Sequence, residues 1–571
     1  MAKKELSPEI RILLAFALSF LILWLGQPLL VRPPQPASPP PAAQGEGNQL
    51  HETPESPAPP AASEIGPPPL LEIEPKQGET EQEITVEGDL YRVVFSTRGA
   101  VVKSWTLRQY RDEQGQPLEL VNSPAAAEFG YPLTLWPSDE AVRREINSAL
   151  FVPSVIGQQQ APVTIVFEYS SGQRAVRKEI SFSRDGYVAE LETRLASDGI
   201  PLPHGIAWPG GFGDVHDVGM RGSGVQVFYR EPQRMTLLDP GDVEGQESTA
   251  SGMFPFAGIQ DHFFTAVFLP EGGPLRITAF RQEVAVPDQE RRQPSLGVAV
   301  GSGEFPENRL RLYVGPKLAE TLAAVDPLLP GLIDYGWFTF IAKPLFVAMR
   351  WIHDHIVANY GWSIVLLTVF INTLLFPLKI KSLRSSMKMQ KLQPQIRAIQ
   401  EKYKQYKMND PRKQEMSRET MALYKKHGVN PLGGCLPMLL QIPFLYGFYK
   451  VLIVSIEMRH APWILWVQDL SAPEPITVKV LPLLMCGTQF LLQKMSPTPS
   501  PDPAQQKIMM FMPVMFLFFF WNLSSGLVLY WLTGNLVGIA QQWYINRTEM
   551  KHVIEERKNT VARKKKGGAK K

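Results

Sequence analysis

Five apolar stretches separated by polar or charged segments fill the C-terminal two-fifths of the chain, and they constrain its fold more than any other feature. A helix of about 20 apolar residues can cross a hydrocarbon core about 30 Å thick. A similar stretch near the N-terminus covers residues 12–31, so the sequence predicts an α-helical membrane protein with six spans. The five C-terminal stretches are 362–378, 432–454, 476–492, 508–521 and 527–543.

The distribution of charge predicts how these spans are oriented. Residues 379–428 contain 14 Lys and Arg against 4 Asp and Glu, and the tail after residue 545 contains 10 against 3. Basic segments of bacterial inner-membrane proteins stay in the cytoplasm, so we expect both termini to be cytoplasmic. Within 379–428, Asp410-Pro411 suits a helix start and Gly428 a helix end, which predicts a helical hairpin.

The N-terminal stretch has two interpretations. Its length exceeds the roughly 7–15 apolar residues of a signal peptide, which favours an uncleaved membrane anchor over residues 1–31. A cleaved signal peptide is the alternative, because small residues follow at Pro41-Ala42-Ala43.

The composition changes along the chain and predicts further segments. Residues 32–80 are rich in proline, which predicts a disordered tether. Residues 81–325 show short β-branched and aromatic runs, which predict a large periplasmic β-sandwich domain. Residues 326–360 are amphipathic and aromatic, as in a helix lying at the membrane interface. Residues 361–545 would form a membrane core of five spans including the hairpin, and 546–571 a basic cytoplasmic tail.

The sequence does not favour an enzyme. It contains no glycine-rich phosphate loop, nucleophile elbow or metal-ligand spacing, so we expect no cofactor and no metal. Two polar clusters, 213–217 and Asp261-His262, are best interpreted as loop groups that satisfy turns. Carbohydrate binding by the β domain is the alternative hypothesis that these clusters suggest.

Polar side chains within the apolar stretches are the informative residues. In hydrocarbon such side chains usually face a bundle interior or a wet cavity, although single residues more often join helices by hydrogen bonds. Their distribution over four spans favours a shared polar groove, in which Thr368 and Asn372 share one helical face and Thr373 lines it only in part. The other polar residues in or beside the spans are Gln441, Thr488, Gln489, Gln493, Thr533, Asn535, Gln541 and Gln542.

Several motifs in the expected places resemble the YidC/Oxa family of membrane protein insertases. The most specific is Asn-Pro-Leu-Gly-Gly-Cys-Leu-Pro at 430–437, which continues to Gln441-Ile-Pro443. Others are Leu392-Gln-Pro394, Gln493-Lys-Met-Ser-Pro497, Phe511-Met-Pro513 and Ser525-Gly-Leu-Val-Leu-Tyr530.

This resemblance implies a non-enzymatic insertase with a hydrophilic groove that receives nascent membrane proteins and releases their apolar segments into the lipid bilayer. It implies that Thr368, Gln441, Tyr530, Trp531 and Thr533 line the groove or contact the substrate. It also implies partnership with the Sec translocon and with ribosomes. The basic tail could also contact ribosomal RNA or anionic lipid.

One position departs from the family pattern. Asn372 stands where the family usually has an arginine, five residues before a Pro-Leu pair. Lys379 or Lys381 would then supply positive charge from the cytoplasmic rim of the groove, and Asn372→Arg should be tolerated.

Two other functions stay open at this point. A secondary transporter with a periplasmic ligand-binding domain is one, although neither internal repeats nor ionisable residues at mid-span are evident. A scaffold for envelope assembly is the other, and deletion of the β domain would abolish its activity.

Overall fold

The computed structural model describes residues 74–568 except 113, 215–223, 244, 286–291, 304, 337, 407–409, 429–435 and 497–502. The predicted N-terminal anchor, most of the tether, residues 215–217 of the first polar cluster and most of the 430–437 motif lie outside these residues. Two compact units divide the chain. One combines 69–360 with Pro443–Ala472, and the other includes Gly361–Ile442 and Pro473–Lys571.

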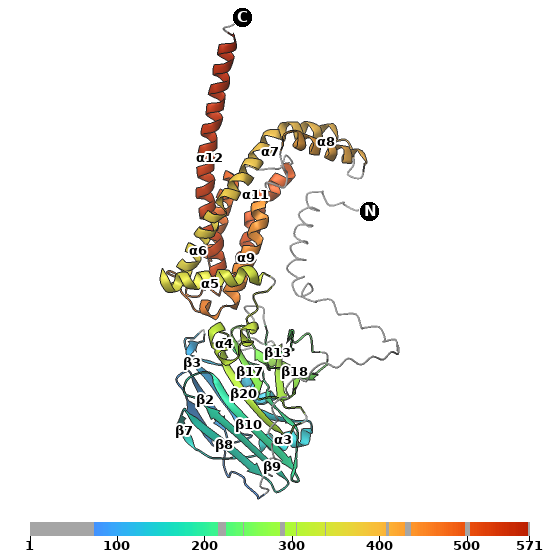
Figure 1. Ribbon diagram of the computed structural model, residues 1–571, viewed down its shortest axis with the longest axis vertical. Helices are drawn as coiled ribbons and strands as arrows, with labels where there is room; N and C mark the ends of the chain where they lie inside the picture. The colour runs from blue at the N-terminus through green and yellow to red at the C-terminus, as the bar shows by residue number, and fades with distance from the viewer. Residues whose placement is uncertain are drawn as a thin grey trace, which may run out of the picture. The chain divides into compact units, whose positions relative to one another are not determined.

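The first unit is built on strands, as predicted (Figure 1). One sheet has the order β4-β3-β2-β1-β7, a second β14-β13-β16-β17-β20-β10-β9-β8-β6 with β11 beside β10, and a third β15-β18-β19-β12-β5. The first sheet comprises β1 Glu83–Glu87, β2 Tyr91–Ser96, β3 Val101–Arg111, β4 Pro117–Glu119 and β7 Gly157–Gln160. The second comprises β6 Val152–Pro153, β8 Val163–Ser170, β9 Arg174–Phe182, β10 Val188–Ser197, β11 Ile200–Pro201, β13 Gln226–Arg230, β14 Met235–Leu238, β16 Ala257–Gln260, β17 Phe264–Pro270 and β20 Glu307–Pro316. The third comprises β5 Thr134–Pro137, β12 His204–Trp208, β15 Glu247–Gly252, β18 Leu275–Ala285 and β19 Arg292–Gly301.

Two of the β-branched and aromatic runs that predicted this domain form β8 and β10, which both pair with β9. Their side chains alternate between buried and partly exposed, as expected for strands with one face in a core. The turns between them use Gly172 and Gly186 with φ of +87° and +110°, a conformation that glycine adopts without steric cost.

The predicted sandwich has three sheets around one core, and it is not wholly antiparallel because β1 and β7 run parallel. Val93, Ile180 and Val298, one from each sheet, belong to the same buried cluster. Four short helical segments complete the domain: α2 Ser123–Phe129, α3 Glu140–Ser148, α4 Ala319–Val325 and η1 Leu329–Leu332.

A helix in the region predicted to be interfacial, α5 Thr339–His355, has two apolar faces. Leu345 and Met349 are buried, whereas Phe340, Val347 and Trp351 are exposed. Positions 340, 347 and 351 follow helical spacing and therefore form one exposed apolar stripe. In the same unit α5 packs on the outer part of α9, where a side chain at Gly447 would meet Ile341 and Leu345.

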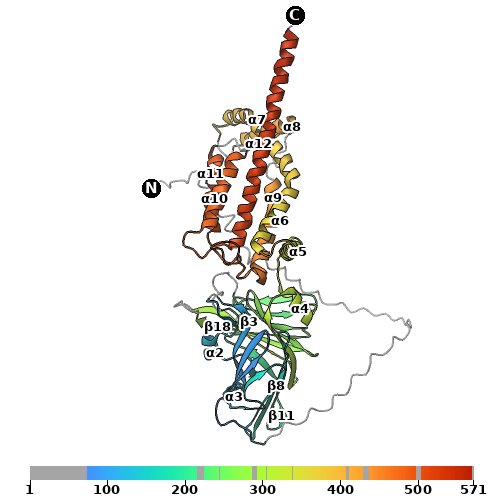
Figure 2. The same cartoon turned by 90° about the vertical axis from the view of Figure 1, so that its left-hand side faces the viewer.

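The second unit is helical (Figure 2). The helices are α6 Tyr360–Leu374, α7 Phe376–Lys402, α8 Arg412–Lys426, α9 Leu436–Val454, α10 Val480–Met495, α11 Pro503–Phe520 and α12 Ser525–Gly568, and the division between the units falls within α9. Among the described residues, α6 and α7 together are long and apolar enough to span a membrane as a pair bent by 56°, whereas no single helix is. Shorter apolar helical stretches cover Gln441–Val454 and Met510–Phe520.

The two helices predicted between residues 379 and 428 are present as α7 and α8. Helix α7 begins at Phe376, earlier than expected, and so continues directly from the apolar segment. Met389, Leu392 and Ile396 of α7 pack with Leu423 and Tyr424 of α8. Gly428 follows α8 with a φ of +63°, as expected for a helix-ending glycine.

Candidate functional site

A polar cluster lies where α6 bends into α7. Thr368 and Asn372 are buried one turn apart on α6, as predicted. The Thr368 hydroxyl donates to the Ile364 carbonyl at 2.6 Å, and the Asn372 amide nitrogen donates to the Thr368 carbonyl at 2.8 Å. Because its nitrogen is bonded within the helix, Asn372 presents its Oδ1 atom to neighbouring groups.

That oxygen accepts a hydrogen bond from Lys379. The Lys379 ammonium lies 2.6 Å from Asn372 Oδ1 and is partly buried. Pro377, the second residue of α7, has no backbone N–H and cannot continue the hydrogen bonding of α6, which explains a bend here. Lys379 follows Asn372 by seven residues, or about two turns, so its side chain can reach back along the same side.

Helix α12 completes the cluster through Gln541. Its amide nitrogen donates to the Asn372 carbonyl at 3.0 Å, and its Oε1 accepts from the Lys379 ammonium at 3.4 Å. A Cβ atom at Gly534, about two turns earlier on α12, would lie 4.0 Å from the Asn372 amide nitrogen. The polar faces of α6 and α12 therefore meet at Asn372.

The charge of Lys379 is not neutralised locally. Its two hydrogen-bond acceptors are amide oxygens, and it forms no ion pair within the described part of the chain. A cation among apolar helices usually has a partner or faces water, so this site has an unused capacity to attract an anion. Sequence reasoning placed Lys379 at the rim but did not connect it to Asn372 or Gln541.

A second polar group joins α10 to α12. The Trp531 indole nitrogen donates to Gln489 Oε1 at 3.3 Å. One turn later, the Asn535 amide nitrogen lies 3.3 Å from both the Met485 carbonyl and the Thr488 hydroxyl. These contacts agree with the alternative that single polar residues join membrane helices by hydrogen bonds.

The remaining predicted residues are divided between buried and exposed positions. Tyr530 is buried and hydrogen-bonds with Gln441, which connects α12 to α9, and Thr533 is buried as well. Thr373 and Lys381 are exposed, and the Thr373 hydroxyl bonds to the Val369 carbonyl of its own helix. The structure thus places most of the predicted groove residues around α12, but Thr373 and Lys381 lie apart from them.

The outer surfaces of α10 and α11 are apolar. Leu484 and Phe490 of α10, and Phe511 and Phe518 of α11, are exposed large hydrophobic side chains. Exposing such an apolar surface to water is unfavourable, whereas contact with lipid tails is not. The helical unit therefore has the exterior expected of a membrane domain.

The polar clusters of the β domain serve its own packing. Asp261 Oδ1 accepts from the backbone nitrogens of Phe263 and Phe264 at 2.8 and 2.6 Å, and its Oδ2 accepts from the Asp214 nitrogen at 2.9 Å. Burial raises the pKa of Asp261, and these backbone donors oppose that rise. The interpretation of Asp261 as a turn-satisfying residue is confirmed.

Comparison with known proteins identifies a membrane protein with a periplasmic domain. The family model described as "60Kd inner membrane protein" matches residues 351–553, and the model "YidC periplasmic domain" matches residues 83–208 and 211–348. The chain is 35% identical over 559 residues to "Membrane protein insertase YidC" of Pelobacter propionicus, covering 94% of this chain and 99% of that protein. It is 34% identical to the protein of the same name from Syntrophus aciditrophicus, again covering 94% and 99%.

The chain therefore belongs to the YidC family of membrane protein insertases. Among solved structures it is similar to an active YidC insertase with the first transmembrane domain resolved, at a TM-score of 0.35 and 20% identity. That match covers 83% of this chain and 96% of the solved one. The relatives are named as insertases and not as enzymes.

Proposed function

We propose that this chain inserts membrane proteins by receiving their polar segments at the Lys379 ammonium, between α6, α7 and α12. The supporting observation is that Asn372 and Gln541 hold this cation without a neutralising carboxylate among the described residues. An acidic or strongly polar stretch of an entering protein could bind there while its apolar segment leaves into lipid. A charged residue costs about 2.5–3.5 kcal/mol at the bilayer centre, so even partial compensation speeds insertion.

The proposed topology has six spans. The anchor at 12–31 and the α6–α7 pair would supply the first two, and α9, α10, α11 and the first part of α12 the others. The α7–α8 hairpin and both termini would lie in the cytoplasm because of their basic charge. Residues 361–545 would form the core, with the apolar segments of the entering protein leaving along α9 and α11.

The proposed groove includes the other polar candidates that surround α12. Gln441, Gln489, Tyr530, Trp531, Thr533 and Asn535 would keep it hydrated, and Thr368 would orient Asn372. Thr373 and Lys381, which are exposed, would contact the entering chain only outside the cluster. The basic tail and the hairpin would meet the ribosome, and the Sec translocon would act with the chain on larger substrates.

Reconstitution of the purified full chain in liposomes tests this proposal. Single-span substrates would carry translocated tails that are either acidic or neutral, and insertion would be measured as protease protection without ATP. Lys379→Gln should lower insertion of the acidic-tail substrate about tenfold and that of the neutral one much less. Lys379→Arg should retain most activity because it keeps the charge.

Lys381→Gln is the matched control, since Lys381 is two residues away and exposed. It should insert both substrates like the original chain. Equal activity of Lys379→Gln and Lys381→Gln on the acidic-tail substrate would refute the role of Lys379. Failure of the original chain to insert either substrate would refute the proposed activity itself.

A further inference from the structure

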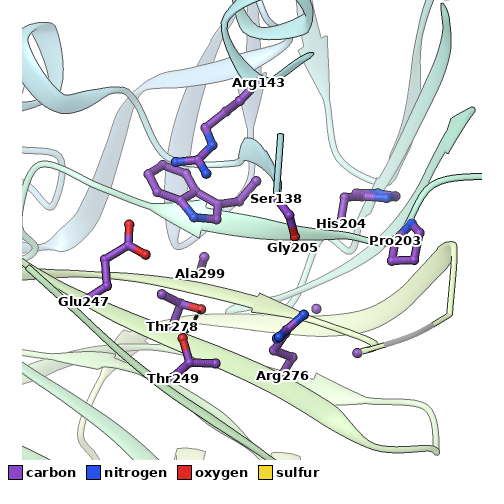
Figure 3. Close-up of a pocket in the computed structure, with 13 residues that line it drawn as sticks. Ser138, Arg143, Pro203, His204, Gly205, Glu247, Thr249, Arg276, Thr278 and Ala299 are labelled. Atoms are coloured by element: carbon purple, nitrogen blue, oxygen red, sulfur yellow. Dashed lines mark hydrogen bonds between the residues drawn. The ribbon is translucent and has the colours of Figure 1, made fainter. Parts of the chain in front are cut away.

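The third sheet of the β domain is hollowed on its outward face. Its central strands carry alternating small and large residues: Ile206, Val298 and Val300 point into the core, and the residues between them point outward. These outward positions hold only small residues: Ala207 pairs with Ala299, and Gly205 and Gly301 are the next outward positions of the two strands. Ala207 is buried in a cluster with Phe280, whereas Gly205, Ala299 and Gly301 line the hollow. The result is a cavity of about 250 Å³ with a floor of backbone and methyl groups (Figure 3).

One wall of this hollow is a rigid aromatic and cationic stack. Trp136 of β5 lies parallel to Phe280, with ring centroids 4.7 Å apart and an angle of 4°. The Arg143 guanidinium of α3 lies 3.8 Å from the centre of the Trp136 ring. Its Nε and Nη2 atoms both donate to the Pro137 carbonyl, at 3.3 and 3.2 Å. This fixes the guanidinium and leaves its Nη1 atom without an acceptor among the described residues.

The opposite wall is polar and comes from β15 and β18. Thr249 lies directly across from Thr278, and their hydroxyls are 3.1 Å apart. Arg276 of β18 pairs through its backbone with Gly301, and its exposed guanidinium has neither a hydrogen bond nor an ion pair with any residue in the described ranges. Glu247 also lines the hollow. The lining thus carries two guanidinium groups, one carboxylate and the hydroxyls of Ser138, Thr249 and Thr278.

We propose that this hollow binds a small organic anion that also carries hydroxyl groups, with its carboxylate or phosphate group between Arg276 and Arg143. Arginine forks recognise both kinds of oxyanion through paired N–H donors. The Thr249 and Thr278 hydroxyls and the Glu247 carboxylate then bind the hydroxyl groups of the ligand. The cavity is smaller than the roughly 300–1,000 Å³ of sites for drug-sized molecules, so it suits one sugar-sized ring.

This site differs from the polar clusters that the sequence first suggested for carbohydrate binding. Asp214 and Asp261 are engaged in the packing of the β domain, as described above. The signal that could have located the hollow is the alternation in Gly-Val-Ala-Val-Gly at 297–301, where every outward position is small. The proposal is independent of the insertase mechanism, because it uses none of the membrane helices.

Calorimetric titration of the detergent-solubilised full chain tests the proposal. The ligands are galacturonate, glucose 6-phosphate, neutral galactose and inorganic phosphate. We expect at least one sugar anion to bind, and both galactose and inorganic phosphate to bind at least tenfold more weakly than it does. The preferred anion distinguishes a carboxylate from a phosphate ligand.

Three variants make the test specific. Arg276→Gln should weaken binding of the sugar anion at least tenfold, since it removes an exposed guanidinium without packing partners. Gly205→Val should abolish binding by filling the floor, and its Cβ would meet no atom closer than 3.5 Å. Arg144→Gln, next to Arg143 but 76% exposed and paired with Glu140, should bind like the original chain.

Three results would overturn the proposal: no binding of either sugar anion, galactose bound as tightly as the sugar anions, or inorganic phosphate bound as tightly as glucose 6-phosphate. The first result would show that the hollow binds no sugar anion. The second would show that the arginines do not select an anion, and the third that the hydroxyl groups of the ligand are not recognised. Equal effects of Arg276→Gln and Arg144→Gln would also overturn it, because they would place binding elsewhere.

Discussion

Asp214 and Arg459 form an ion pair with a distance of 2.6 Å, and both side chains are only 4% exposed. Arg459 follows η3 Ile456–Met458, a turn just beyond α9. In the same unit the His262 ring nitrogen Nε2 donates to the Ile453 carbonyl at 2.6 Å, and Ile456 belongs to the main buried cluster of the β domain. The segment after α9 is therefore packed as part of the β domain.

We expect Arg459→Met to destabilise the β domain by about 3–5 kcal/mol, because it leaves the Asp214 carboxylate buried without its ionic partner. Asp214→Leu combined with Arg459→Met should recover most of this loss, since both charges are then removed. Thermal unfolding of the original chain, Asp214→Leu, Arg459→Met and the double variant gives a double-mutant cycle. Additive effects of the two single changes would contradict a coupled pair.

The location of positive charge around Asn372 allows a second prediction. Asn372 Oδ1 and the Lys379 ammonium are 2.6 Å apart, so an arginine at position 372 would place its charge in the same cluster. We expect Asn372→Arg to restore the insertion that the Lys379→Gln chain loses. Alone, Asn372→Arg should be tolerated because the Lys379 side chain can turn away. Growth of an insertase-depleted strain measures both.

Asn372→Gln in the Lys379→Gln background is the control, since it adds length without charge. It should not restore growth. If it restored growth as well as arginine does, hydrogen bonding rather than charge would explain the site.

The sequence predicted a β-rich domain and a helical C-terminal region because these signals are local. The alternation in β8 and β10 and the helix-ending Gly428 depend on neighbouring residues alone. The sheet order could not be predicted, since β12 pairs with β5 and β19, far from it along the chain. The candidate site also has a predictable and an unpredictable part. The spacing of Thr368 and Asn372 predicts that they share a helical face, whereas the contact of Gln541 with Asn372 joins residues 169 positions apart.

The packing of α5 on α9 gives a third prediction, which also depends on structure. A Cβ atom at Gly447 would lie 3.2 Å from side-chain atoms of both Ile341 and Leu345. Gly447→Leu should therefore force the helices apart and cost about 1–3 kcal/mol. A Cβ atom at Gly487 on α10 would meet nothing within 4 Å, so Gly487→Leu is the matched control.

Limited proteolysis of the chain in detergent measures this change. We expect faster cleavage near α5 in Gly447→Leu and the original pattern in Gly487→Leu. Identical patterns for both leucine variants would show that α5 does not need the glycine.

The last prediction concerns the pH dependence of the β domain through His204. Its side chain is buried, its Nδ1 atom donates to the Leu202 carbonyl at 3.0 Å, and its Nε2 atom accepts from the Thr193 hydroxyl at 2.8 Å. Burial lowers the pKa of His204 from 6.5 to about 4, and the nearby charge of Lys178 adds to the effect. The folded domain therefore holds the neutral imidazole well below the pH at which the unfolded chain binds a proton.

The direction in which stability changes with pH follows from proton binding to His204. Between pH 6.5 and 4 the unfolded chain carries the His204 proton and the folded chain does not, so stability falls as the pH is lowered. The loss amounts to roughly 3 kcal/mol across this window and ends below about pH 4, where both states are protonated. His204→Gln should be less stable at pH 7 but should show a flatter decline between pH 6.5 and 4. Thermal unfolding followed by tryptophan fluorescence measures stability at each pH. His355→Gln, which changes an exposed residue of α5, is the control and should show the same loss of stability with falling pH as the original chain. If His204→Gln also showed that unchanged loss, other groups would cause the pH dependence.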